Sequence, residues 1–338
     1  MIDPFSDEQA RALVNLAQYY RSWMDAQRAL AKLPYDLRKK RVGGREYLYD
    51  IHDRGGNGTS LGPMSETLQA QLDHYREQKA DLKSRRDLAL SALDESCRLY
   101  RALRLPLLAA GAGEVLREAD LRAMLGPDLM VIGTNAMPAY SIEAAGFIRD
   151  APDETQDFDL AWTNPNAVPG ERPLWAMLKA ADPTYTLNSE REFQARNARA
   201  YEVEILVAPS NAKGLARTDQ PRPVALPEQE WLLNGTPVDH VVVCRDSSPA
   251  RLFVPDPRWF ALHKLWLSKK IGRNPLKRPK DERQGIAMLD AVHLSMPQFA
   301  MDEKFEAQLP EELAILFTHW RERRPARSAP PWARRQGA

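Results

Sequence analysis

The sequence has few cysteines and no long apolar run. Cys97 and Cys244 are its two cysteines, and their separation fits neither a disulfide framework nor a zinc site. No run approaches the roughly 20 apolar residues that a membrane span needs. The acidic first residues lead directly into an amphipathic pattern, unlike a signal peptide. We therefore expect a soluble cytoplasmic protein with no membrane partner.

An excess of charge of one sign is also lacking. The 47 basic and 46 acidic residues give a formal net charge of +1, so no global field indicates a nucleic-acid partner. The histidines lack metal-ligand spacing, and no nucleophile–base pair is discernible. Nothing in the sequence indicates an oligomeric state.

The patterning predicts an α+β protein that begins with a helical arm over residues 1–105. Ser6 and Gln9 form a capping-box pattern that starts a helix ending near Leu33. Residues 43–62 alternate around a glycine-rich turn and predict a β-hairpin. From Met64 to about Leu103 there is no proline or glycine, which predicts one very long helix or two with a bend.

Two further domains and a tail follow. Short strands and helices alternate over residues 106–254 and predict a small mixed-sheet core. Three helical patterns, 256–270, 280–294 and 310–323, predict a C-terminal helical domain over 255–324. The proline- and arginine-rich residues 325–338 contain too few apolar side chains to pack, so we expect disorder there.

The main chemical signal lies between Leu129 and Trp162. The apolar run Leu129–Ile132 meets Gly133-Thr134 and then a helical pattern to Ala145, so unpaired N–H groups at the turn could receive a phosphate. Asp157 and Asp159 alternate with apolar residues, which places both carboxylates on one strand face. Neighbouring carboxylates repel unless a cation lies between them, and oxygen ligands suit Mg²⁺. This pattern indicates nucleotidyl transfer.

A third acid is available from the strand predicted at Tyr201–Val207. Glu202 and Glu204 share one face there, and Glu204 lies deeper in the apolar run, which favours it without excluding Glu202. Three carboxylates around two Mg²⁺ ions would activate an attacking hydroxyl and neutralise the triphosphate and leaving pyrophosphate.

These motifs, in this order, resemble the polymerase-beta-like nucleotidyltransferase superfamily, whose pattern is Gly-Gly/Ser, Asp-hydrophobic-Asp and a later acid. The surrounding sequence is similar to the bacterial branch called nucleotidyltransferase family 8, through Ile132–Met137, Thr155–Asp159 and Pro255–Leu265. The resemblance covers roughly residues 1–295.

The resemblance implies a role for each matching residue. Gly133 and Thr134 would contact the triphosphate, Asp157 and Asp159 would hold Mg²⁺ (or Mn²⁺), and Glu204 would activate the acceptor hydroxyl. Lys264 would contact phosphate from the C-terminal domain. Lys280 opens the next helix and could reach the same cleft.

Three features depart from the superfamily pattern. The spacer between Gly133 and Asp157 is long, so residues 146–156 are expected to form an inserted loop. The turn is Gly-Thr instead of Gly-Ser. The third acid is Glu where Asp is common.

The expected substrates are an NTP and an acceptor hydroxyl; ATP binding is expected, and the sequence leaves the base preference open. Related bacterial enzymes include toxins that modify tRNA ends. Two basic segments, Lys264–Arg283 and the residues flanking Tyr47 and Tyr49, favour RNA as the acceptor. A protein or small-molecule acceptor, or a catalytically inactive nucleic-acid-binding scaffold, are the alternatives.

Overall fold

The computed structural model describes residues 2–149, 157–166, 173–212 and 219–324. The chain divides into two compact units, Asn15–Arg98 (the inserted unit) and Met1–Val14 with Leu99–Ala338 (the main unit). Among the described residues no helix is both long and apolar enough to cross a membrane. The mixture of helices and sheets confirms the predicted α+β class, while the subdivision of the main unit into 106–254 and 255–324 stays a proposal.

Two long helices, α1 (Asp7–Ala31) and α2 (Glu66–Ala102), enter the inserted unit. The capping box is confirmed, because the Ser6 N–H donates to Gln9 Oε1 at 2.9 Å and the Gln9 N–H donates to Ser6 Oγ at 3.2 Å. Helix α2 is continuous, in agreement with the absence of proline and glycine.

The β-hairpin predicted at 43–62 is confirmed as the antiparallel pair β3 (Arg45–Ile51) and β4 (Gly58–Pro63), and a third antiparallel strand that was not predicted, β2 (Asp36–Val42), pairs with β3. Strand β2 was missed because it contains four consecutive basic residues and lacks the alternation of a half-buried strand. Leu37 and Leu48 of the sheet form a small core with Leu72 and Tyr75 of α2.

The principal sheet of the main unit has the order β6-β8-β11-β10-β9, with β12 beside β11. β8 is antiparallel to β6 and parallel to β11, and β10 is antiparallel to β11. The strands are β6 (Leu129–Ile132), β8 (Asp157–Trp162), β9 (Thr186–Leu187), β10 (Gln194–Arg196), β11 (Glu202–Val207) and β12 (Val224–Ala225).

Two smaller sheets complete the β-structure of the described residues. One pairs β14 (Pro249–Val254), β13 (Val238–Cys244) and β5 (Leu107–Leu108), and the other pairs β1 (Ile2–Pro4) with β7 (Gly146–Ile148). Strand β7 corrects the start of the expected loop 146–156, because residues 146–148 pair with the N-terminal strand. Residues 150–156 and the tail 325–338 lie outside the described residues.

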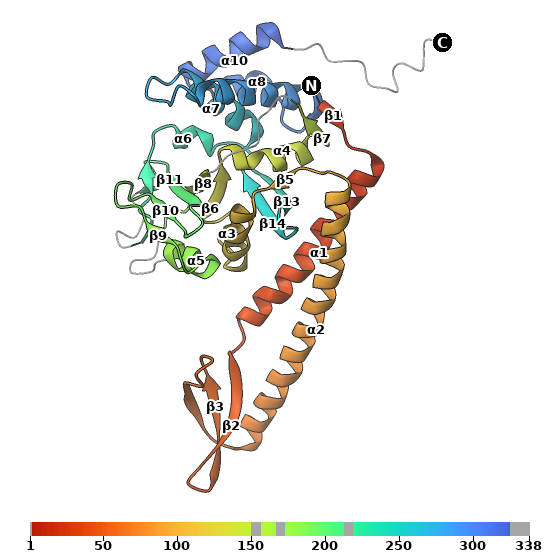
Figure 1. Ribbon diagram of the computed structural model, residues 1–338, viewed down its shortest axis with the longest axis vertical. Helices are drawn as coiled ribbons and strands as arrows, with labels where there is room; N and C mark the ends of the chain where they lie inside the picture. The colour runs from red at the N-terminus through yellow and green to blue at the C-terminus, as the bar shows by residue number, and fades with distance from the viewer. Residues whose placement is uncertain (1, 150–156, 167–172, 213–218, 325–338) are drawn as a thin grey trace. The chain divides into compact units, whose positions relative to one another are not determined.

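The helices of the main unit pack around these sheets. The predicted helix 134–145 begins as the 3₁₀ turn η1 (Thr134–Ala136) and continues as α4 (Met137–Glu143). Figure 1 shows α7, α8 and α10 together at one end of the main unit, and they confirm the three predicted C-terminal helices. The other helical bounds are α3 (Ala110–Leu121), α5 (Pro173–Ala181), α6 (Gln229–Leu232), α7 (Pro257–Lys269), α8 (Arg278–Ser295), α9 (Glu303–Glu306) and α10 (Glu311–Arg323).

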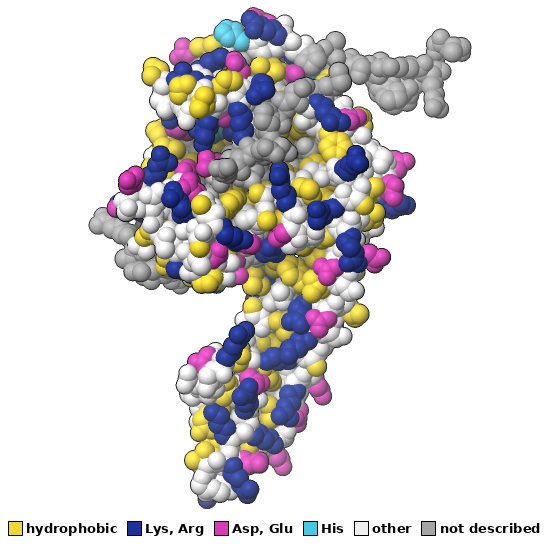
Figure 2. Space-filling model, in the orientation of Figure 1, with side chains coloured by type: hydrophobic (Ala, Val, Ile, Leu, Met, Phe, Trp, Pro, Cys, Tyr) yellow, Lys and Arg dark blue, Asp and Glu magenta, His cyan; other side chains and the backbone are white. Residues whose placement is uncertain are grey.

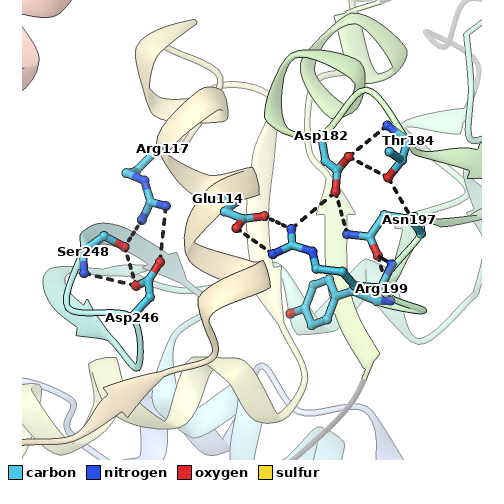
Figure 3. Close-up of polar contacts among 10 residues, drawn as sticks. Glu114, Arg117, Asp182, Thr184, Asn197, Arg199, Asp246 and Ser248 are labelled. Carbon is cyan, nitrogen blue, oxygen red and sulfur yellow. Dashed lines mark hydrogen bonds and ion pairs between the residues drawn. The ribbon is translucent and has the colours of Figure 1, made fainter.

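Helix α3 forms hydrogen bonds and ion pairs with residues of two loops (Figure 3). Glu114 accepts from both terminal nitrogens of Arg199, whose guanidinium also reaches Asp182 at 3.3 Å. Arg117 Nη1 donates to Ser248 Oγ at 2.6 Å, in the turn between β13 and β14. These contacts connect α3 to both larger sheets of the main unit.

We expect Leu160→Ala to lower the free energy of unfolding by about 3 kcal/mol, because Leu160 is fully buried at the centre of β8. Leu88→Ala is the matched control, since 70% of Leu88 is exposed, and it should cost under about 0.5 kcal/mol. Urea unfolding measures both. An equal loss of unfolding free energy in the two variants would show that Leu160 is not packed in the core.

Candidate active site

The parallel pairing of β8 with β11 brings four carboxylates together. Asp157 lies opposite Glu202, and Asp159 lies opposite Glu204. Residues paired across two strands share a face, so all four acids project from the same side of the sheet. The alternate residues Phe158, Leu160, Val203 and Ile205 are fully buried on the other side. The alternation predicted for both strands is therefore present.

Gly133 directly follows β6, next to this acidic face. Its φ of +74° lies in the left-handed region that glycine favours, and a Cβ at this position would lie 2.2 Å from Asp159 Oδ2. Thr134 follows at the start of η1 and is buried, and its Oγ1 accepts from Gln284 Nε2 of α8 at 3.4 Å. The Gly-Thr turn thus lies beside the acids, with the threonine hydroxyl directed to a C-terminal helix.

Burial and neighbouring acids raise the pKa values of Asp159 and Glu204. Burial raises the pKa of Asp159, and the charge of Asp157 adds to this effect while Lys264 opposes it. Burial, with the charges of Asp159 and Asp157, raises the pKa of Glu204 to about 7. A cation among these carboxylates would relieve the crowding of negative charge.

The two predicted lysines differ in their surroundings. Lys264 is buried, and its Nζ donates to Asp281 Oδ1 at 3.0 Å, while Arg273 Nε donates to the other oxygen at 2.8 Å. Burial lowers the pKa of Lys264, although Asp281 opposes this. Lys280 is half-buried on α8. Lys277, which was not predicted as a site residue, contacts an acid of β8: its Nζ donates to Asp157 Oδ2 at 2.7 Å.

The sequence interpretation also missed Gln194 of β10. This buried side chain donates from Nε2 to Glu202 Oε2 at 2.9 Å and to Glu204 Oε1 at 3.0 Å. Arg196 Nε donates to Glu202 Oε1 at 2.6 Å. Glu202 is therefore held by a close ion pair, whereas Arg191 Nη1 lies 3.9 Å from Glu204 Oε1. Strand β10 has three residues, too few to show a periodic signal.

A cavity of about 420 Å³ opens beside the acids and includes Asp159, Glu204 and Lys264 in its lining. One wall is apolar and is formed by Phe193, Leu206, Val224, Leu226 and Leu267. Gln229 and His263 also line the cavity and are buried, and neither Gln229 Oε1 nor His263 Nδ1 has a hydrogen-bond partner among the described residues. Burial lowers the pKa of His263 to about 3, so its ring is neutral.

The basic stretch Lys264–Arg283 is largely paired with acids of the same fold. Lys269 contacts Glu282 and Lys270 contacts Glu228, each at 2.6 Å, in addition to the pairs made by Lys264, Arg273 and Lys277. Its cations therefore balance local carboxylates, which weakens the prediction that this stretch follows a phosphodiester backbone.

The donor chemistry of Asp157, Asp159 and Glu204 fits a hard divalent cation, because all three offer carboxylate oxygens on one face. Within the described ranges, no group of three His, Cys, Asp or Glu side chains is placed close enough to hold a metal ion. Lys277 contacts Asp157 directly, so a cation would compete with this ammonium group.

Gly133→Ala is expected to lower the free energy of unfolding by about 2–4 kcal/mol, because the added methyl meets Asp159 and the alanine must adopt the positive φ of this turn. Gly43→Ala is the matched control: its φ is +58° and no atom lies within 4 Å of the added Cβ, so it should cost about 1 kcal/mol. Urea unfolding compares the two variants. Equal costs would exclude close packing of Gly133 against Asp159.

Comparison with known proteins identifies the family of this chain. The family model described as "Nucleotidyltransferase" matches residues 110–309, which is more than half of the chain. No curated protein gave a match. A crystal structure of an antigenic nucleotidyltransferase-like protein from Paracoccidioides brasiliensis is 17% identical and covers 65% of this chain and 92% of its own, with a TM-score of 0.36. On the family match, which confirms the resemblance drawn from the motifs, this chain belongs to the nucleotidyltransferase family.

Proposed function

We propose that this nucleotidyltransferase moves a nucleoside monophosphate from an NTP to an acceptor hydroxyl in a reaction that depends on Mg²⁺, with Mn²⁺ as an alternative. The observation that carries the proposal is the β8–β11 register, which places Asp157, Asp159 and Glu204 on one face beside the Gly133 turn. The adjoining cavity of about 420 Å³ lies within the range of small-molecule sites.

The side chains around the cavity suit the parts of an NTP. Lys264 and Arg273 line it and share the single acidic partner Asp281, so this cluster would offer one net positive charge to the triphosphate, together with the N–H groups of the Gly133-Thr134 turn. The apolar wall formed by Phe193, Leu206, Val224, Leu226 and Leu267 would cover the nucleoside. Gln229 and His263 offer the polar atoms that could read the base.

The transfer is an in-line displacement at the α-phosphorus. The acceptor oxygen forms a bond to this phosphorus, the bond from it to the bridging oxygen breaks, and pyrophosphate leaves. Glu204 would take the proton of the acceptor hydroxyl. The Mg²⁺ ions, held by Asp157, Asp159 and Glu204, would neutralise charge on the triphosphate and pyrophosphate. Lys277 would leave Asp157 as the ion binds.

RNA, and first the end of a tRNA, is the acceptor we propose. The support comes from the inserted unit, where the register pairs Lys40 with Tyr47 and Arg38 with Tyr49 on one face of the sheet. The Lys40 ammonium lies 4.8 Å from the centroid of the Tyr49 ring. Basic and aromatic side chains on one sheet face suit the phosphates and unstacked bases of single-stranded RNA.

Incubation with Mg²⁺, each labelled NTP and total bacterial RNA should label RNA. Asp157→Ala/Asp159→Ala should lower the rate at least about a thousandfold, because the charge on the triphosphate is then uncompensated. Glu190→Ala/Glu192→Ala is the matched control: it removes an exposed acid pair of the same spacing and should leave the rate unchanged.

The other outcomes separate the alternatives. Label on protein or on a small molecule would keep the chemistry and change the acceptor. RNA binding without any transfer, unchanged in the Asp157→Ala/Asp159→Ala variant, would contradict the enzymatic proposal and indicate an inactive scaffold.

We expect Gln229→Leu to reduce the preference of the enzyme for one NTP over the others by up to about tenfold, since it removes one neutral hydrogen bond to the base. Leu226→Ala, on the apolar wall, should lower kcat/KM for all four NTPs by the same factor. Relative kcat/KM values for the four NTPs measure this. Unchanged ratios in Gln229→Leu would show that Gln229 does not read the base.

A further inference from the structure

A second cavity of the main unit is lined by arginines. It encloses about 590 Å³ between the end of α2, β5, α4, β7 and the residue after β13, and it shares no lining residue with the acid-lined cavity. Arg101, Arg104, Arg149 and Arg245 line it, and its described lining contains no aspartate or glutamate. In Figure 2 several Lys and Arg side chains lie on the face over β5 and β7.

The contacts of these arginines leave an excess of positive charge. Arg149 pairs with Asp3, and Arg101 donates to the uncharged hydroxyl of Ser247. The side chain of Arg104 makes no hydrogen bond or ion pair with the described residues, and all four arginines are exposed at the rim. Arg101 and Arg104, which have no acidic partner among the described residues, therefore bring positive charge to one concave surface, and this charge focuses a field that attracts an anion.

The remaining walls indicate a ligand that also has a flat apolar part. Apart from the polar side chain of Ser141, they are formed by Leu105, Pro106, Leu107, Met137, Pro138, Phe147 and Ile148. The Phe147 ring is half-buried, and the Arg149 guanidinium lies 5.7 Å from its centroid. Guanidinium groups bind phosphate through paired N–H donors, and an apolar or aromatic wall accepts a nucleobase.

We propose that this arginine cavity binds a phosphate-bearing nucleotide, either free or as one unit of a single-stranded RNA. Its volume lies within the range of small-molecule sites, and its charge is opposite to that of the acid-lined face. Binding there needs neither the carboxylates of β8 nor a divalent ion, so the proposal stands or falls independently of the transfer reaction.

The test measures equilibrium binding of AMP and of a short labelled single-stranded RNA to the full chain in EDTA, where transfer cannot occur. Arg104→Glu should weaken binding of AMP, RNA or both by at least about tenfold, because it replaces a charge-assisted hydrogen bond with repulsion. Arg104→Lys, which keeps the charge but loses the paired donors, should have a smaller effect. Arg323→Glu on α10 is the control, since it makes the same charge change at an exposed residue outside the cavity.

The pattern of losses identifies the source of the nucleotide. Weaker binding of both ligands indicates a site that accepts a free nucleotide, and weaker binding of RNA alone indicates one unit within a strand. Wild-type affinity of Arg104→Glu for both ligands would overturn the proposal. An equal loss in Arg323→Glu would also overturn it, because net charge would then account for the effect. Thermal unfolding of each variant confirms that the fold is retained.

Discussion

The parallel register between β8 and β11 is the constraint on which the site depends. It places Asp159 against Glu204 and Asp157 against Glu202, on the side of the sheet opposite the buried residues of both strands. A shift of one residue would turn these acids into the core. The packing of the apolar face therefore fixes the position of the carboxylates.

The surrounding residues compensate for the charge that this register creates. Gln194 donates to both glutamates, and Lys277 contacts Asp157. Gly133 leaves the space that Asp159 Oδ2 occupies. Helices α7 and α8 contribute a buried pair of Lys264 with Asp281, and a hydrogen bond from Gln284 to Thr134 connects α8 to the turn. The main unit thus joins an acid-lined face to a cavity suited to a nucleotide, and it carries a separate arginine-lined cavity.

Patterns within one segment could be predicted from the sequence, and contacts between distant short segments could not. The alternation around Asp157 and Glu204 predicted both strands and the face that the acids share, because a strand with one buried face has a period of two. Helix α2 was evident from its composition. The consecutive basic residues of β2 lack the alternation that predicts a strand. The pairing of β1 with β7 involves three residues on each side, too few to give a periodic pattern.

The same limit applied to the choice of site lysines. Lys277 stands in a basic stretch, and local spacing cannot show that it reaches a strand 120 residues earlier. Gln194 carries no charge and lies on a strand of three residues. The turn pattern and the family resemblance both predicted that Gly133 and Thr134 contact the triphosphate, whereas the close approach of Asp159 to Gly133 and the hydrogen bond from Gln284 to Thr134 came from the fold.

The central claim is that the carboxylates of β8 and β11 bind a nucleotide through a divalent cation. Calorimetric titration of a non-hydrolysable NTP analogue with and without Mg²⁺ tests it most directly. We expect Mg²⁺ to tighten binding of the NTP analogue at least about tenfold. The Asp159→Asn variant should bind the analogue with the same affinity with and without Mg²⁺. Equal affinity with and without Mg²⁺, in both the wild type and Asp159→Asn, would contradict it.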